Sequence, residues 1–189
     1  MKKKWVALLV ALVILTGSAS TLAATPSKTT EDLTRVIGVE TKAGEISDAI
    51  IWVEETPSEV AKTQLDAMKS FVEKKNPPVN YFPDAAKTEI AALVPKGTDL
   101  TKLNLSEYAA FSVGDYDATL GDIYATFQFP TVFTVGKTVV ALVGFKSSDG
   151  TIVWHALETI VVNGNLRIVF PSTLLEKSGH ELVLAVLSN

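Results

Sequence analysis

The sequence contains no cysteine and only two histidines, His155 and His180. The absence of cysteine excludes a disulfide scaffold, a thiolate zinc site, an iron–sulfur cluster and a cysteine nucleophile. Two histidines are too few for a histidine-rich metal centre. A formal net charge of −4 argues against a partner bound by bulk attraction to phosphates. We therefore expect no cofactor and no nucleic-acid partner.

Catalytic motifs are missing as well. The chain has no glycine-rich phosphate loop, no His-Glu zinc helix and no Gly-x-Ser-x-Gly elbow. Hydrophobic residues make up 47% of the chain and charged residues 20%, which is the balance of a globular protein. The sequence thus predicts a folded protein that is not an enzyme.

Residues 1–24 have the layout of a secretory signal peptide. Lys2, Lys3 and Lys4 precede the uncharged apolar run Trp5–Leu15, and small residues follow up to Ala24. The apolar run is shorter than the roughly 20 residues that span a bilayer. We expect cleavage after Ala23 or Ala24, with a membrane anchor retained at this end as the alternative.

The predicted mature chain is acidic. Without the three leading lysines it has 14 basic and 21 acidic residues, a net charge of −7. That charge suits a protein that is dissolved outside the cytoplasm and does not suit docking on anionic lipid. We expect a secreted bacterial protein with no membrane contact after cleavage. The sequence indicates no oligomeric state.

A helical segment is predicted over residues 46–97. Residues 46–55 fit either a helix or a buried strand, and the helix is favoured. The clearest helix begins at the capping box Thr56-Pro57-Ser58-Glu59, with Thr56 as N-cap and Pro57 at the first helical position. Its apolar stripe is Ala61, Leu65, Met68 and Val72. A second helix is predicted over residues 83–93.

After Gly97 the hydrophobic period changes from 3.6 to 2. Strands are predicted over residues 105–113, 123–129, 138–145, 151–157, 159–162, 165–170 and 181–187, with one helical turn over 171–178. Asn163-Gly164 between β-branched runs specifies a two-residue hairpin. About seven short strands joined by turns are typical of a β-sandwich.

The fold class predicted is α+β. Its parts are a signal peptide at 1–24, a flexible leader with a short strand at 25–45, the helical segment at 46–97 and an all-β Ig-like sandwich at 98–189. We expect the helices to pack against the sandwich, because the connection over residues 95–101 is short.

The stretch 121–188 resembles Ig-like β-sandwich modules of uncharacterised secreted and surface proteins of Gram-positive anaerobic bacteria. The resemblance rests on the alternating strand before Pro130, on Gly136-Lys137, on the Asp149-Gly150 and Asn163-Gly164 hairpins, and on the final Leu184–Ser188. It covers about a third of the chain. It implies surface display, adhesion or domain spacing, and it supplies no catalytic residues.

Three carboxylates form the one candidate metal site. Asp115, Asp117 and Asp122 lie near a predicted turn, and clustered oxygen ligands suit Ca²⁺. Their spacing lacks the alternation and the closing Glu of a calcium loop. Aspartates that bond to the backbone of the turn are the favoured interpretation, so no metal is predicted.

Aromatic residues are the better indication of a binding surface. Tyr108, Tyr116, Tyr124 and Phe133 fall early in the β segment, and aromatics on one sheet face can stack on a sugar or pack against a protein. The competing interpretation is that they fill the core. His155 follows Trp154 on a strand, so Trp154 is expected inside and His155 outside.

The preferred function is therefore a secreted, non-enzymatic binding or adhesion module with a protein or glycan partner at the cell surface. One alternative is a small extracytoplasmic hydrolase that uses His155 or a carboxylate pair among Glu54, Glu55 and Glu59. A pocket that joins such groups favours it. Another alternative is a spacer or assembly subunit that pairs through an exposed C-terminal strand, 181–187.

Overall fold

Nine strands in two antiparallel sheets form most of the described structure, together with three α-helices. The computed structural model describes residues 34–44, 51–114, 116–178 and 181–189. The predicted signal peptide and the leader up to residue 33 lie outside these ranges. The protein is thus a β-rich α+β fold, as the change of hydrophobic period predicts.

Each sheet combines strands from distant parts of the chain. The four-stranded sheet has the order β1 (Arg35–Thr41), β4 (Ile123–Gln128), β8 (Asn165–Phe170) and β7 (Thr159–Val162). The five-stranded sheet has the order β2 (Ile51–Val53), β3 (Asn104–Val113), β9 (Glu181–Ser188), β5 (Val139–Lys146) and β6 (Ile152–Leu157).

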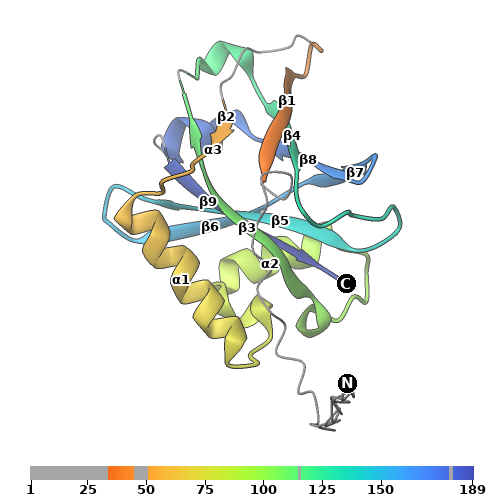
Figure 1. Cartoon of the computed structure of the whole chain (residues 1–189). Coiled ribbons are helices and arrows are strands. Elements are labelled where there is room, and N and C mark those ends of the chain that lie inside the picture. Colours follow the sequence, from red (N-terminus) through yellow and green to blue (C-terminus); the bar gives the residue numbers. More distant parts are fainter. Residues whose placement is uncertain (1–33, 45–50, 115, 179–180) are drawn as a thin grey trace, which may run out of the picture.

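The two long helices cover only one of the two sheets. Helices α1 (Glu59–Glu73) and α2 (Asp84–Leu93) pack on the face of the five-stranded sheet that points away from the four-stranded sheet, where they contact β3, β9 and β6 (Figure 1). The helix α3 (Ser172–Ser178) connects β8 to β9 and buries Leu174 and Leu175 in the core between the sheets. Among the described residues, no helix lies on the outer face of the four-stranded sheet (Figure 1).

Two predictions for the helical segment are wrong. Residues 51–53 form strand β2, which pairs with β3, whereas a helix was favoured over 46–55; residues 46–50 lie outside the described part of the chain. The sheet edge offered by β3 decides in favour of the strand. The N-cap of α1 is Ser58, whose hydroxyl accepts a hydrogen bond from the Ala61 amide, and not Thr56. Glu181 on β9 accepts from the Ser58 amide at 2.8 Å and so fixes the helix start against the sheet.

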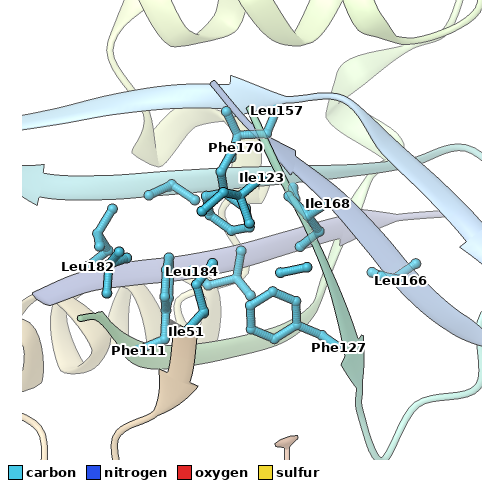
Figure 2. Close-up of a cluster of buried hydrophobic side chains, with 14 of the residues drawn as sticks. Ile51, Phe111, Ile123, Phe127, Leu157, Leu166, Ile168, Phe170, Leu182 and Leu184 are labelled. Carbon is cyan, nitrogen blue, oxygen red and sulfur yellow. The ribbon is translucent and has the colours of Figure 1, made fainter. Parts of the chain in front are cut away.

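Two hydrophobic cores lie on opposite faces of the five-stranded sheet. The core between the sheets contains Phe111, Phe127 and Phe170, which meet edge to face or tilted at 5.5–6.3 Å (Figure 2). The second core lies under the helices, where Phe82 packs edge to face on Trp154 at 5.0 Å. The five-stranded sheet is therefore buried on both faces, while the four-stranded sheet is buried on one.

Strand β9 is the central strand of the five-stranded sheet. It pairs with β3 on one side and β5 on the other, so both of its edges are hydrogen-bonded. The alternative in which this C-terminal strand is an exposed edge for assembly is therefore wrong. Its continuous apolar sequence reflects burial on both faces and not availability to a partner.

The hairpins form as predicted. Asn163 and Gly164 have φ values of 50° and 82°, and Val162 pairs directly with Asn165 across the two-residue turn. In the β5–β6 hairpin the Asp149 carboxylate accepts hydrogen bonds from Ser147 and Thr151. These bonds, led by the one from the Ser147 hydroxyl, lower the pKa of Asp149 to about 2.

Gly144 on β5 is a close-packed position. A methyl group added at Gly144 would lie 2.8–2.9 Å from three ring atoms of Trp154, its partner on β6. The Trp154 ring is fixed in turn by Phe82 and Tyr81. The absence of a side chain at Gly144 therefore allows the ring to lie flat on the sheet.

We predict that Gly144→Ala lowers the free energy of unfolding by about 1–3 kcal/mol, because the ring must move out of a packed core. The matched control is Gly38→Ala on β1, where an added methyl group meets nothing within 4 Å. Its effect is expected to stay within about 0.5 kcal/mol. Urea unfolding of both variants measures the difference. If both variants lose the same free energy of unfolding, the contact between Gly144 and the Trp154 ring does not contribute to stability.

Candidate functional site

The candidate calcium ligands have structural roles in the described residues. Asp117 caps a short 3-10 helix, since its Oδ1 accepts from the Thr119 amide at 2.8 Å, and this bond lowers the pKa of Asp117. Asp122 accepts from the Ser172 amide at the start of α3. Asp115 lies outside the described residues. Over the described ranges, no three Asp, Glu or His side chains come together as a metal site would require.

The four aromatic candidates do not form one surface. Phe133 is 5% exposed and belongs to the core between the sheets, so its prediction as a surface residue is wrong. Tyr108 is half-buried against the core under the helices. Tyr116 packs against the core between the sheets, where burial raises its pKa, and its hydroxyl donates to the Gly121 carbonyl at 2.8 Å. Only Tyr124 lies on the outer face of the four-stranded sheet.

A polar cluster surrounds Tyr124 on that outer face. The Arg167 guanidinium lies over the Tyr124 ring, 4.8 Å from its centroid, and also forms an ion pair with Glu40. On the same face Arg35 donates to Gln128. Strands β1, β4 and β8 thus each contribute side chains to polar contacts on this outer face.

Beside this cluster the surface is apolar. Ile160 and Val162 on β7 pair with Arg167 and Asn165 and so lie on the same outer face. The loop between β4 and β5 carries Val132 and Val135, which are 78% and 76% exposed. Val132 touches the β7–β8 turn, because a methyl group placed on Gly164 would lie 3.0 Å from it. We call Ile160, Val162, Val132 and Val135 the hairpin patch.

The loop that carries Val132 and Val135 is held in place at several points. Glu107, a buried carboxylate on β3, accepts from the Thr131 amide at 2.9 Å. The Phe133 amide donates to the Gly164 carbonyl at 3.0 Å, and the Phe133 ring is buried between the sheets. The two valines are therefore presented on a fixed backbone.

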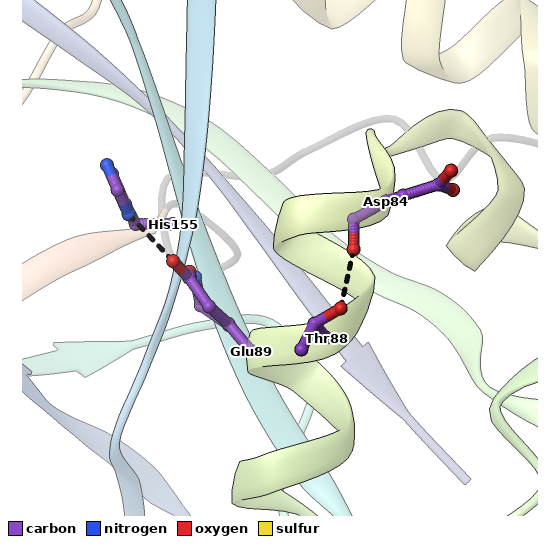
Figure 3. A network of polar contacts seen from close by, with 5 residues as sticks. Asp84, Thr88, Glu89 and His155 are labelled. Atoms are coloured by element: carbon purple, nitrogen blue, oxygen red, sulfur yellow. Dashed lines mark hydrogen bonds and ion pairs between the residues drawn. The ribbon is translucent and has the colours of Figure 1, made fainter.

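A second site joins α2 to the edge of the five-stranded sheet. Glu89 on α2 accepts from the Ala156 amide at 2.8 Å with one carboxylate oxygen, and its other oxygen lies 3.1 Å from His155 Nδ1 (Figure 3). Since β6 is an edge strand, this carboxylate occupies a backbone donor that would otherwise be open to another strand. Trp154 is buried and the His155 side chain is 39% exposed, as the alternation predicted.

His155 also borders a hollow of about 190 Å³ between β6 and α3. Its ring stacks on Phe145, with centroids 6.0 Å apart. The ring nitrogen Nε2 points away from Glu89 (Figure 3) and has no hydrogen-bond partner in the described part of the chain. The remaining lining residues are Leu157, Pro171, Thr173, Leu174, Lys177, Glu89 and Ala156. A histidine oriented by a carboxylate can accept a proton or bind a ligand, but no described hydroxyl bonds to Nε2 as a nucleophile would.

Sequence reasoning missed Glu89, Arg167 and Trp52. Trp52 on β2 is 43% exposed, and its indole donates to Glu54 at 2.9 Å. The register of the Asn163-Gly164 hairpin would have placed Arg167 opposite Ile160, on the face away from the core. No local signal could have placed Glu89 beside His155, because 66 residues separate them.

Comparison of the chain with protein-family models, with curated proteins and with solved structures found no match. Within the described ranges no helix is long and apolar enough to cross a membrane. The function must therefore be argued from the two surfaces described above.

We predict that Glu89→Ala lowers the free energy of unfolding by about 1 kcal/mol, because it leaves the Ala156 amide and His155 without their acceptor. Glu73→Ala, at the end of α1, is the matched control and is expected to change stability by less than about 0.5 kcal/mol. Chemical denaturation measures both. If the two variants are equally stable, Glu89 does not fasten α2 to the sheet.

Proposed function

We propose that the protein is an exported, non-enzymatic binding module whose partner is another protein, docked on the hairpin patch. The observation that carries this proposal is the exposure of Val132 and Val135, in the loop that meets the β7–β8 turn at Gly164, together with the exposure of Ile160 and Val162 on β7. Large aliphatic side chains gathered on one face are typical of protein-docking surfaces. Export rests on the predicted signal peptide at 1–24.

A protein partner is favoured over a glycan by the side chains available. Sugars stack on open aromatic faces, but Arg167 already lies over the Tyr124 ring. The large hydrophobic side chains that remain exposed there are aliphatic, and Thr134 and Lys137 of the same loop are exposed with them. Lys137 follows in the same loop and forms no ion pair with any described residue. We therefore infer a partner surface that is apolar at its centre and acidic where it meets Lys137.

The anchored loop supports a role in binding. Glu107 and Gly164 hold the backbone on either side of Val132, and the buried Phe133 ring prevents the loop from lifting away. A surface that is ordered before binding loses little conformational entropy when a partner docks. The fixed loop would therefore favour affinity for a partner of matching shape.

The finer features of the fold belong to this proposal. We propose that the two sheets are an Ig-like sandwich of the type found in bacterial surface proteins, and that the helical segment after β2 is an addition to it. The shared core between the sheets supports a sandwich, and the pairing of β1 and β2 with the sheets extends it toward the N-terminus. The resemblance of residues 121–188 to such modules implies surface display or adhesion by analogy of fold, so the binding role rests on the hairpin patch.

The test uses labelled mature protein and intact cells of the bacterium that produces it. We expect saturable binding that is lost when the cells are treated with protease. The double variant Val132→Ser/Val135→Ser should bind about tenfold more weakly, because it removes the apolar centre of the contact. Leu93→Ser, an exposed position on α2, is the control and should bind as the unchanged protein does.

Two results would contradict the proposal. Equal binding by the double variant and the Leu93→Ser control would show that the hairpin patch is not the docking surface. Binding that survives protease and is competed by purified wall polysaccharide would show that the partner is a glycan. Val132, Val135 and Leu93 are all exposed, so the double variant and the Leu93→Ser control should both keep the stability of the unchanged protein. Urea unfolding checks this.

A further inference from the structure

We propose that the hollow between β6 and α3 is a binding site for a small monocarboxylate with an apolar body of about one ring. This site is separate from the hairpin patch and does not depend on the proposed protein partner. The proposal rests on the orientation of His155, on two further unpartnered polar groups at the hollow, and on the apolar residues that line it. The Glu89 carboxylate also lines the hollow, but one of its oxygens contacts His155 and the other accepts from the Ala156 amide.

His155 supplies the first polar contact. With Nδ1 directed at Glu89 by a 3.1 Å contact, the ring is held in place and Nε2 is left for a ligand. Stacking on Phe145 holds the ring plane as well. A carboxylate suits Nε2 when both ring nitrogens carry hydrogen, because Nδ1 then donates to Glu89 and Nε2 donates to the ligand.

Thr173 and Lys177 supply further contacts from α3. Both side chains line the same hollow, and neither has a hydrogen bond or ion pair within the described residues. They are four residues apart on a helix, so they lie on one face of it. An ammonium group and a hydroxyl that line the same hollow as His155 match the two oxygens of a carboxylate better than they match a cation.

The remaining walls select an apolar body. Phe145, Leu157, Leu174 and Pro171 line the hollow beside the polar groups. A volume of about 190 Å³ is close to that of cavities that hold a single benzene ring, and it is too small for most drug-sized ligands. Benzoate and cyclohexanecarboxylate therefore match both the size and the chemistry of the hollow.

The test is an NMR titration of the mature protein with benzoate. The chain has only two histidines, so a His180→Gln variant assigns the imidazole signals of His155 directly. We expect saturable shifts of the His155 ring and of the Leu174 methyl groups, with a dissociation constant on the order of 1 mM, the range that about nine non-hydrogen atoms reach in an open site. Benzyl alcohol, which has the ring without the charge, and acetate, which has the charge without the ring, should each bind about tenfold more weakly.

Variants separate this site from general surface effects. Lys177→Met and His155→Gln should each weaken benzoate binding about fivefold to tenfold, while Lys102→Met, at an exposed lysine of a 3-10 helix, should leave it unchanged. Equal binding of benzyl alcohol and benzoate would overturn the proposal, because the hollow would then be an apolar crevice only. It would also be overturned by the absence of saturation, or by benzoate binding that Lys177→Met leaves intact.

Discussion

The structure depends on a central strand that is buried on both of its faces. Residues of β9 alternate between the two cores: Leu182, Leu184 and Val186 lie between the sheets, and Val183, Ala185 and Leu187 lie under the helices. Both edges of β9 are hydrogen-bonded. The register of β9 is therefore strongly specified, because a one-residue slip would exchange the contents of the two cores. Without cysteine, this packing must stabilise the fold by itself.

The location of the exposed surfaces follows from the same constraint. The helices and the four-stranded sheet cover the two faces of the five-stranded sheet, and no described helix or strand covers the outer face of the four-stranded sheet. That face contains the Tyr124–Arg167 cluster and the hairpin patch. The free edge beside α2 is occupied by the Glu89 carboxylate. The surfaces that are open to a ligand or partner are therefore those that do not pack against the five-stranded sheet.

Strong local patterns predicted most of the elements. Period-2 alternation located β4 and β6, and Asn163-Gly164 located the β7–β8 turn to the residue. Strand β2 was missed, because three residues have no readable period and their state is decided by the edge of β3. The N-cap of α1 was misplaced by two residues, because Glu181, which accepts from the Ser58 amide, is distant in sequence.

The candidate sites were harder to predict than the fold. Phe133 follows Pro130 in a loop, and its burial depends on the anchoring of that loop by Glu107 and Gly164. Tyr124 was correctly placed outward by alternation, but Arg167, which covers its ring, belongs to another strand. The pairing of Glu89 with His155 requires α2 to dock on β6, which no local pattern specifies. Each site is made by tertiary contacts, so the sequence could supply single residues but not their combinations.

Native-state hydrogen exchange tests the role of β9 most directly. If the two cores unfold together because both pack on β9, the amides of β9 and the β5 amides that pair with it should exchange only through global unfolding. Their free energy of exchange should then fall with denaturant as steeply as the free energy of unfolding of the whole protein does. The amides of the edge strands β1 and β7 should exchange through smaller openings. Exchange of the β9 amides at a free energy well below that of global unfolding would contradict the account.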